Sequence, residues 1–344
     1  MGMNERIVAR KTPRLAVSFA GLTLDNPLIP ASGCYGFGYE RADALDPDFF
    51  GTIALKGTTR EARFGNPLPR IAESASGMLN AVGLQNPGVD RVIAEELPKL
   101  AAVSHKGMIA NVAGFSVDDY VDVAKKMDAQ KQIAAIELNI SCPNVHSGGM
   151  EFGVHPETAK AVTAAVKAVL HKPLFVKLTP NVTDIVAMAR AAVEGGADGL
   201  TLINTVKAMR IDWKKRAPLL ANGTGGLSGP AIFPIALRMV YDVYAAVSVP
   251  IIGCGGVQTA EDVVEMMMAG ASAVQIGAAG LADPDMWDAL LTDLEAMPDR
   301  LGVENLSEII GTAHPENGAA HPENASKKVG LCHSRNTNRG KDAT

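Results

Sequence analysis

IAAIELNISCPNVHSGGM, residues 133–150, begins as an almost unbroken apolar run and turns polar within a few positions. The apolar half is typical of a parallel β-strand that is covered on both faces. Cys142 follows at its C-terminal end, among asparagine side chains, and Pro143 favours an extended conformation for it. The pattern predicts a catalytic thiol at the mouth of a strand. The alternative is a structural cysteine, because cysteines are usually buried.

Seven further strands are predicted on either side of this one, separated by helical patterns. The eight strands are expected at residues 27–31, 52–56, 107–112, 133–139, 174–178, 199–204, 250–253 and 273–277. Helices are expected over residues 117–127, 156–170, 184–194, 231–246 and 260–269. This alternation predicts an α/β protein with a (β/α)8, or TIM, barrel. Residues 15–24 form a predicted β-hairpin that would close the N-terminal end of the barrel.

Length and composition suit one large domain with flanking segments. The 344 residues are 47% hydrophobic and carry a net charge of −5, which argues against general affinity for nucleic acid or an anionic membrane. The charged N-terminus resembles neither a signal peptide nor an anchor, so we expect a cytoplasmic protein. We divide the chain into a flexible segment 1–14, a barrel 15–311 and a disordered tail 312–344, in which AHPEN occurs twice.

Metal chemistry is not expected. The four cysteines show no CxxC spacing, which argues against a zinc site and against an iron–sulfur cluster within this chain. The tail holds three histidines, but its composition favours disorder over a metal site.

Polar residues replace apolar ones at the ends of successive predicted strands. Because the active sites of such barrels lie where strands end, we expect these side chains to meet at one rim. They are Ser32, Lys56, Asn111, Asn139, Cys142, Lys177, Asn204 and Thr205.

Glycines follow the last strands at positions that suit a phosphate group. Gly255-Gly256 and Gly277-Ala278 come directly after the seventh and eighth strands, and Gly229 precedes a proline that can begin a helix. Barrels commonly bind phosphate here through backbone N–H groups and a helix N-terminus. The alternative is that these glycines only form tight turns.

Two long segments interrupt the regular alternation of strands and helices. They are residues 57–88, which contain GMLNAVGLQNPG, and residues 205–229, which contain the basic triplet Lys214-Lys215-Arg216. Long loops in a compact domain are usually functional, and Asn80 with its small neighbours suits close approach to a ligand. The triplet has no aromatic or basic partners nearby, so it is interpreted as a solvated patch.

Several of these motifs together resemble the class 1 dihydroorotate dehydrogenases over about residues 15–311. The matching segments are KGTT, NAVGLQNPG, ELNISCPN, VKLTPNVTDI, INT, NGTGGLSGP and PIIGCGG. The loop SCPNVHSGGMEFG is similar to that of the class 1B catalytic subunits, which work with an iron–sulfur flavoprotein partner. One departure is Ala278, because the family usually has threonine there.

The resemblance implies a role for each site residue, with Cys142 as the catalytic base. It implies that FMN contacts Ser32, Lys56, Gly57, Asn111, Asn139, Lys177, Ile203, Gly229, Gly255, Gly256, Gly277 and Ala278. It implies that the substrate, dihydroorotate, contacts Lys56, Asn80, Ala81, Val82, Gly83, Leu84, Asn139, Asn144, Asn204 and Thr205.

The implied activity is oxidation of dihydroorotate to orotate in pyrimidine biosynthesis, with electrons passing to NAD. FAD and a [2Fe–2S] cluster are expected only in the partner subunit, in a heterotetramer built on a homodimeric core. Alternatives are a dihydropyrimidine dehydrogenase-like subunit, a fumarate-linked class 1A-like homodimer and a flavinless barrel used for binding. A tRNA dihydrouridine synthase is disfavoured, because this chain has no extensive basic surface.

Overall fold

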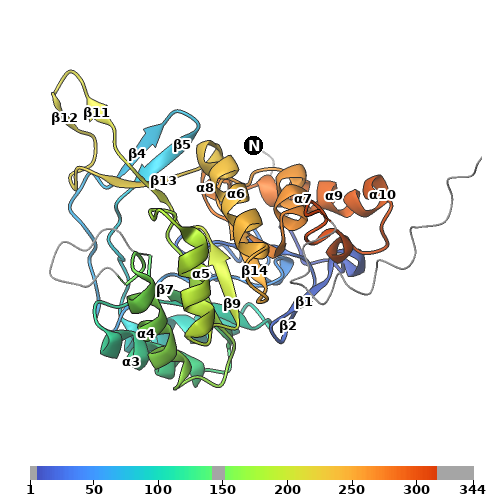
Figure 1. The fold of residues 1–344 in the computed structure, drawn as a ribbon, viewed down its shortest axis with the longest axis horizontal. Coiled ribbons are helices and arrows are strands. Elements are labelled where there is room, and N and C mark those ends of the chain that lie inside the picture. Colours follow the sequence, from blue (N-terminus) through green and yellow to red (C-terminus); the bar gives the residue numbers. More distant parts are fainter. Residues whose placement is uncertain (1–5, 142–151, 316–344) are drawn as a thin grey trace, which may run out of the picture.

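The computed structural model of the chain describes residues 6–141 and 152–315. Its centre is a curled parallel sheet of seven strands in the order β3-β15-β14-β9-β8-β7-β6 (Figure 1). Their bounds are β3 Leu28–Pro30, β6 Met108–Val112, β7 Ile133–Asn139, β8 Leu174–Lys177, β9 Gly199–Leu202, β14 Ile251–Cys254 and β15 Ala271–Ile276. Almost every residue of these strands is buried, as the apolar runs predicted.

The eighth predicted strand, residues 52–56, lies in the gap between the two edge strands. Ala54 N donates to Pro30 O at 3.2 Å, and Leu55 N donates to Ile109 O at 2.9 Å. This segment pairs through a bridge between Ala54 and Ile109 rather than a regular ladder. It nevertheless joins β3 to β6, so the sheet closes into the predicted barrel.

Helices follow the strands and cover the outside of the sheet (Figure 1). The principal ones are α3 Val117–Asp128, α4 Pro156–Lys167, α5 Ile185–Glu194, α6 Phe233–Tyr244, α7 Ala260–Met268 and α9 Met286–Glu295. Side chains cap the N-termini of α3, α5 and α7, where Ser116, Asp184 and Thr259 accept hydrogen bonds from free backbone N–H groups. Each helix buries one apolar face against the barrel.

Shorter helical segments complete the outer layer. They are α1 Val89–Arg91, the π-helical turn η3 Val92–Glu96, α2 Leu97–Ala101, α8 Ala278–Ala282, α10 Met297–Leu301 and the 3-10 turns η1 Pro13–Leu15, η2 Pro47–Phe49, η4 Pro230–Ile232 and η5 Leu306–Ile309. In the part of the chain that the structure describes, no helix has the length and apolar character needed to cross a membrane.

The N-terminal hairpin forms as predicted. β1 Val17–Phe19 pairs with β2 Leu22–Leu24 in antiparallel register around the turn Ala20-Gly21. Phe19 packs edge-on against Phe175 in the first half of β8, with ring centroids 5.9 Å apart. The hairpin therefore covers the end of the barrel at which the strands begin.

The two long insertions pair with each other, which the sequence analysis did not predict. β4 Ile71–Ser74 and β5 Gly77–Asn80 come from the first, and β10 Val206–Ala208 and β13 Gly225–Ser228 come from the second. They form one antiparallel sheet in the order β10-β13-β5-β4. A further hairpin, β11 Ile211–Asp212 with β12 Ala217–Pro218, extends from it (Figure 1). Each insertion therefore stabilises the other beside the C-terminal ends of the barrel strands.

The segments outside the predicted barrel are described only in part. Residues 6–14 contact the barrel: Ile7 bridges Leu45, and Arg10 pairs with Asp288 at 2.7 Å. At the other end, residues 312–315 continue directly from the barrel. Residues 316–344, which hold most of the predicted disordered tail, lie outside the described residues.

Candidate active site

A cavity of about 330 Å³ opens where the barrel strands end, as the strand-end pattern predicted. It is lined by side chains and glycines from all eight strand segments or the loops after them, together with β5 and β13. The predicted site residues that line it are Ser32, Lys56, Gly57, Asn80, Val82, Gly83, Leu84, Asn111, Asn139, Lys177, Ile203, Asn204, Thr205, Gly229, Gly255, Gly256, Gly277 and Ala278.

Three predicted residues are not among these. Cys142 and Asn144 lie outside the described residues, so their positions remain predictions. Ala81 is fully buried in a small separate core with Leu79 and Leu220, and its side chain does not line the cavity. The position of this side chain does not support a contact between Ala81 and substrate, which remains a prediction.

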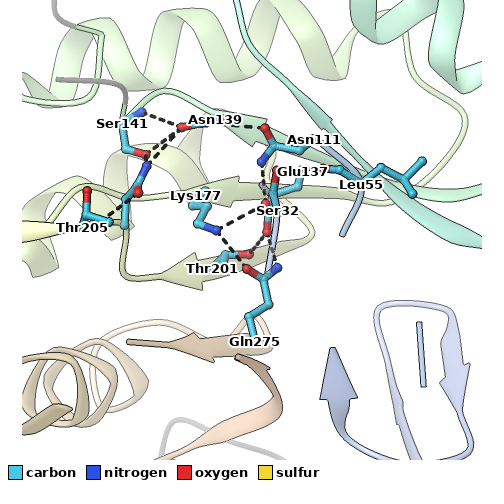
Figure 2. A network of polar contacts seen from close by, with 11 residues as sticks. Ser32, Leu55, Asn111, Glu137, Asn139, Ser141, Lys177, Thr201, Thr205 and Gln275 are labelled. Atoms are coloured by element: carbon cyan, nitrogen blue, oxygen red, sulfur yellow. Dashed lines mark hydrogen bonds and ion pairs between the residues drawn. The ribbon is translucent and has the colours of Figure 1, made fainter. Parts of the chain in front are cut away.

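The floor of the cavity is a buried polar network centred on Glu137 (Figure 2). Its carboxylate accepts hydrogen bonds from Asn111 Nδ2 at 2.6 Å, Thr201 Oγ1 at 2.9 Å and Gln275 Nε2 at 2.6 Å. Lys177 Nζ lies 3.7 Å from Glu137 Oε1 and donates to Gln275 Oε1 at 2.9 Å. All these partners present donors to Glu137, which suits an ionised carboxylate.

This network holds a positive charge below the cavity. Burial lowers the pKa of Lys177, but the adjacent Glu137 carboxylate, Cys254 and Cys34 together raise it more, so that the pKa lies above its usual value. Lys177 is 5% exposed, and Glu137 and Gln275 are fully buried. The ammonium group is thus both desolvated and protonated, which makes it a strong partner for a bound group that is electron-rich.

Amide side chains form one wall of the cavity. Asn139 Oδ1 accepts a hydrogen bond from Ser141 Oγ at 2.8 Å (Figure 2). Asn204 Nδ2 donates to that hydroxyl at 2.5 Å. The side-chain oxygen Oδ1 of Asn204 in turn accepts from Thr205 N at 2.8 Å. These contacts fix the orientation of amides that can both donate to and accept from a planar polar ring.

Lys56 and Ser32 lie on the opposite wall. Ser32 Oγ donates to Leu55 O at 2.7 Å, which ties the loop after β3 to the closing segment 52–56 (Figure 2). A Cβ atom added to Gly33 would lie 3.5 Å from Lys56 Nζ, so the absence of a side chain there keeps the approach to the ammonium group open. The cavity therefore has two lysines from different strand ends.

The glycine-rich loops after β13, β14 and β15 form a backbone cradle at one end of the cavity. Gly256 has φ +78°, and a Cβ atom there would come within 2.6 Å of Phe233 N. Gly229 has φ +102°, and its Cβ would come within 2.7 Å of Gly77 Cα. Only glycine fits both positions without strain. The cradle leads into α7, whose capping box between Thr259 and Asp262 holds the start of that helix.

A buried asparagine outside the predicted site positions the loop Asn80–Leu84. Asn86 Nδ2 donates to Leu84 O at 2.7 Å and to Thr59 Oγ1 at 2.8 Å. Its side-chain oxygen Oδ1 accepts from Gly88 N at 2.9 Å. Asn86 therefore fastens the loop after β5 to the segment that follows Lys56, and brings two parts of the cavity wall together.

Two cysteines that the sequence analysis did not place in the site also line the cavity. Burial raises the pKa of Cys34 to about 11, and burial likewise raises the pKa of Cys254 despite the nearby Lys177. Both are therefore neutral thiols near pH 7, unsuited to act as nucleophiles or bases.

Glu137, Thr201 and Gln275 are the main functional candidates that the sequence analysis missed. A charged residue inside an otherwise apolar strand is the one signal that marked Glu137. Its partners lie 26 to 138 residues away in the chain, so no local pattern could have connected them.

The comparisons with known proteins agree with this architecture. Residues 14–297 match the family model described as dihydroorotate dehydrogenase. Relatives from Anoxybacillus flavithermus, Geobacillus kaustophilus and Halalkalibacterium halodurans are 58%, 56% and 54% identical over 298 residues. The alignments cover 87% of this chain and 95–97% of each relative. All three are named dihydroorotate dehydrogenase B (NAD+), catalytic subunit.

A solved structure shares the fold. The crystal structure of a dihydroorotate dehydrogenase from Eimeria tenella in complex with ferulenol superposes with a TM-score of 0.73 at 24% identity. The match covers 90% of this chain and 91% of that one.

Proposed function

The chain belongs to the dihydroorotate dehydrogenase family, and from this premise we propose that the cavity at its strand ends oxidises dihydroorotate to orotate. This is an NAD-linked step of pyrimidine biosynthesis. One observation carries the proposal: two lysines and four asparagines from separate strand ends and insertions line a single cavity, next to a backbone cradle. The names of relatives at 54–58% identity support the same activity.

The residues around the cavity suit FMN. The cradle formed by Gly229, Gly255-Gly256 and Gly277-Ala278 would hold the phosphate through backbone N–H groups. Lys177, kept protonated by Glu137, would lie at the edge of the isoalloxazine ring that gains negative charge. When bound, FMN would supply the acceptor for the hydride that leaves C6 of the substrate.

Dihydroorotate would be recognised by the remaining polar walls. Lys56 would pair with its carboxylate, and Asn80, Asn139 and Asn204 would hydrogen-bond its uracil-like ring. The loop Asn80–Leu84, fastened by Asn86, would cover one side of the substrate. A substrate without the carboxylate would leave Lys56 without its charge partner, so the cavity would discriminate against it.

Cys142 would take the proton from C5 of the substrate. This role rests on the motif SCPN that follows β7 and on the need for a base during hydride loss. A thiol with a pKa near 8.5 is partly ionised at neutral pH, whereas a serine hydroxyl is a far weaker base.

The word "subunit" in the names of the relatives implies a separate electron-transfer protein. We propose an iron–sulfur flavoprotein that carries FAD and a [2Fe–2S] cluster, in a heterotetramer with two copies of each chain. This chain supports that division of labour, because it has no GxGxxG that follows a strand and opens a helix. Its location in the cytoplasm remains a prediction.

The test is anaerobic reduction of the FMN-loaded protein, which is monitored as the loss of the absorbance of oxidised flavin. Dihydroorotate should reduce the flavin of the wild type within the time of a rapid-mixing experiment. Dihydrouracil, which lacks the carboxylate, should reduce it far more slowly. Cys142→Ser should retain FMN but slow the reduction by dihydroorotate severely, with the largest loss near neutral pH.

Cys332→Ser, the same exchange in the tail, is the control and should reduce at the wild-type rate. A protein that dihydrouracil reduces as fast as dihydroorotate would refute the substrate assignment. Flavin reduction at the wild-type rate in the Cys142→Ser variant would refute the role of that thiol without affecting the substrate assignment.

A further inference from the structure

The last residues that the structure describes belong to a seven-residue unit that the chain contains twice. Residues 311–317 read GTAHPEN, and residues 318–324 read GAAHPEN. The copies follow one another without a gap and differ only at the second position, where Thr312 is replaced by Ala319. The structure describes the first copy as far as Pro315.

The main chain of the first copy pairs with the end of α7. Gly311 N donates to Met267 O at 2.9 Å, and Ala313 N donates to Met268 O at 3.0 Å. Carbonyl groups in the last turn of a helix have no partner within the helix. Met267 O also accepts from Gly270 N at 2.9 Å, so the tail adds a second hydrogen bond to that carbonyl and one to Met268 O.

His314 completes the contact with its side chain. Its Nε2 donates to Ala269 O at 2.9 Å, the next carbonyl after the helix. Its ring stacks on Tyr241 of α6 with centroids 3.9 Å apart and an interplanar angle of 11°, and it also contacts Tyr244 at 4.8 Å. We call Tyr241, Tyr244, Met267, Met268 and Ala269 the tail dock.

The tail dock requires glycine at the first position of the unit. Gly311 has φ +72°, and a Cβ atom there would lie 2.3 Å from Tyr244 Oη. The second copy has glycine at the same position, Gly318. The copies differ only at Thr312, whose side chain contacts a residue outside the dock: its Oγ1 donates to Ile309 O at 2.8 Å. Every residue that touches the dock is thus repeated unchanged.

We propose that the tail dock is a peptide-binding surface for this unit, and that residues 318–324 of the same chain are its second occupant. Binding of the second copy requires residues 311–317 to leave and form a loop. The cost of closing a loop rises only slowly with its length, and the tether keeps the second copy at high effective concentration. The first copy predominates in the wild type, because it needs no such loop.

The experiment uses full-length protein labelled with [2-13C]histidine at the imidazole, with histidine substitutions to assign the signals. A ring stacked on tyrosine gives a shifted C2–H resonance. In the wild type this resonance should belong to His314. In His314→Ala a shifted resonance should persist and now belong to His321, because the second copy has replaced the first.

Two double variants separate docking from a general loss of structure. His314→Ala/His321→Ala and His314→Ala/Gly318→Ala should both lose the shifted resonance, the second because alanine clashes with Tyr244 Oη. Each should melt about 2 °C below His314→Ala, the shift expected for a contact of this size in a large domain. His321→Ala alone and the control His333→Ala, a tail histidine outside the unit, should melt like the wild type.

The proposal is overturned if His314→Ala alone abolishes the shifted resonance. It is also overturned if His321→Ala changes nothing in the His314→Ala background. A His321 resonance that grows with protein concentration would place the second copy on a neighbouring chain, and would overturn binding within one chain.

Discussion

Glu137 shows how much of this site depends on one residue. It places a carboxylate inside the barrel, where an unpaired charge would be severely destabilising. Three hydrogen-bond donors and Lys177 compensate for its lost hydration. In return, Glu137 keeps the pKa of Lys177 raised although burial acts in the opposite direction. The pair therefore acts as a unit that keeps a protonated lysine beneath the cavity.

We predict that Glu137→Gln lowers both stability and the reduction potential of bound flavin. The amide places a donor against existing donors and leaves Lys177 buried without its counter-charge, a change that typically costs about 3–5 kcal/mol. Burial then dominates, so the pKa of Lys177 falls and its charge is lost at lower pH than in the wild type. Thermal unfolding and potentiometric titration at several pH values measure the two effects.

Glu194→Gln is the matched control, because Glu194 pairs with Lys160 at 2.9 Å on the surface. It should leave the melting temperature and the flavin potential near the wild-type values. Equal behaviour of the two variants would show that the buried network has no special role.

At the scale of elements, the loops after the late strands are predicted to bind phosphate. Gly256→Ala should weaken FMN retention strongly, because the added Cβ would displace the backbone at Phe233 N. Gly223→Ala is the control: Gly223 has φ +76° but nothing within 4 Å of the added atom. Gly223→Ala should lose about 1–2 kcal/mol of stability from backbone strain alone, and Gly256→Ala should lose more because of its clash; only Gly256→Ala should release FMN on gel filtration. Equal FMN retention would contradict a phosphate site here.

Asp128 links the end of α3 to the start of β8. Its carboxylate accepts hydrogen bonds from His171 N at 3.1 Å, Lys172 N at 2.9 Å and the His171 ring at 2.9 Å. Burial raises its pKa, but these hydrogen bonds, with that from the His171 ring foremost, lower it more, so the pKa lies below its usual value of 3.8. A carboxyl group whose pKa is lower in the folded than in the unfolded protein stabilises the fold at any pH above its unfolded-state pKa. This stabilisation is lost as the pH falls through the folded-state pKa.

We therefore predict that Asp128→Asn has a lower melting temperature than the wild type at neutral pH. This difference in melting temperature should narrow as the pH falls below 3.8. Asp43→Asn, at an exposed position, should show no such pH-dependent gap. Differential scanning calorimetry across this pH range makes the comparison. A gap that is constant with pH would show that Asp128 acts through its shape rather than its charge.

Local patterns determined most elements correctly. The strand Ile133–Asn139 was predicted to the residue, and the helices predicted at residues 117–127, 184–194 and 260–269 begin within one residue of α3, α5 and α7. Long-range pairing was not predictable in the same way. The insertions contain short strands with little alternation, so nothing local indicated that Gly226 would pair with Asn80.

The candidate site was predictable for a related reason. Barrel topology brings the strand ends together, so a polar residue such as Lys177 or Asn204 at a strand end could be assigned to the rim from its position alone. Side chains that act through others could not be assigned. Glu137, Thr201 and Gln275 lie below the cavity, and their hydrogen bonds depend on the three-dimensional arrangement of strands β7, β9 and β15.

At the scale of the whole molecule, the barrel, the paired insertions and the hairpin have separate roles. The hairpin covers the end where strands begin, and the insertions extend the wall of the cavity where strands end. The chemistry that we propose is confined to this cavity. In this proposal, delivery of electrons to NAD requires a second protein.

The proposed activity is best tested by steady-state oxidation of dihydroorotate by the purified, FMN-loaded chain alone. With an artificial dye as acceptor, orotate should form at a substantial rate. With NAD as acceptor, turnover should be negligible until the electron-transfer subunit is added, and NADH should then form in step with orotate. Rapid NAD reduction by the isolated chain, fumarate turnover equal to that with the dye, or no orotate with any acceptor would contradict the account.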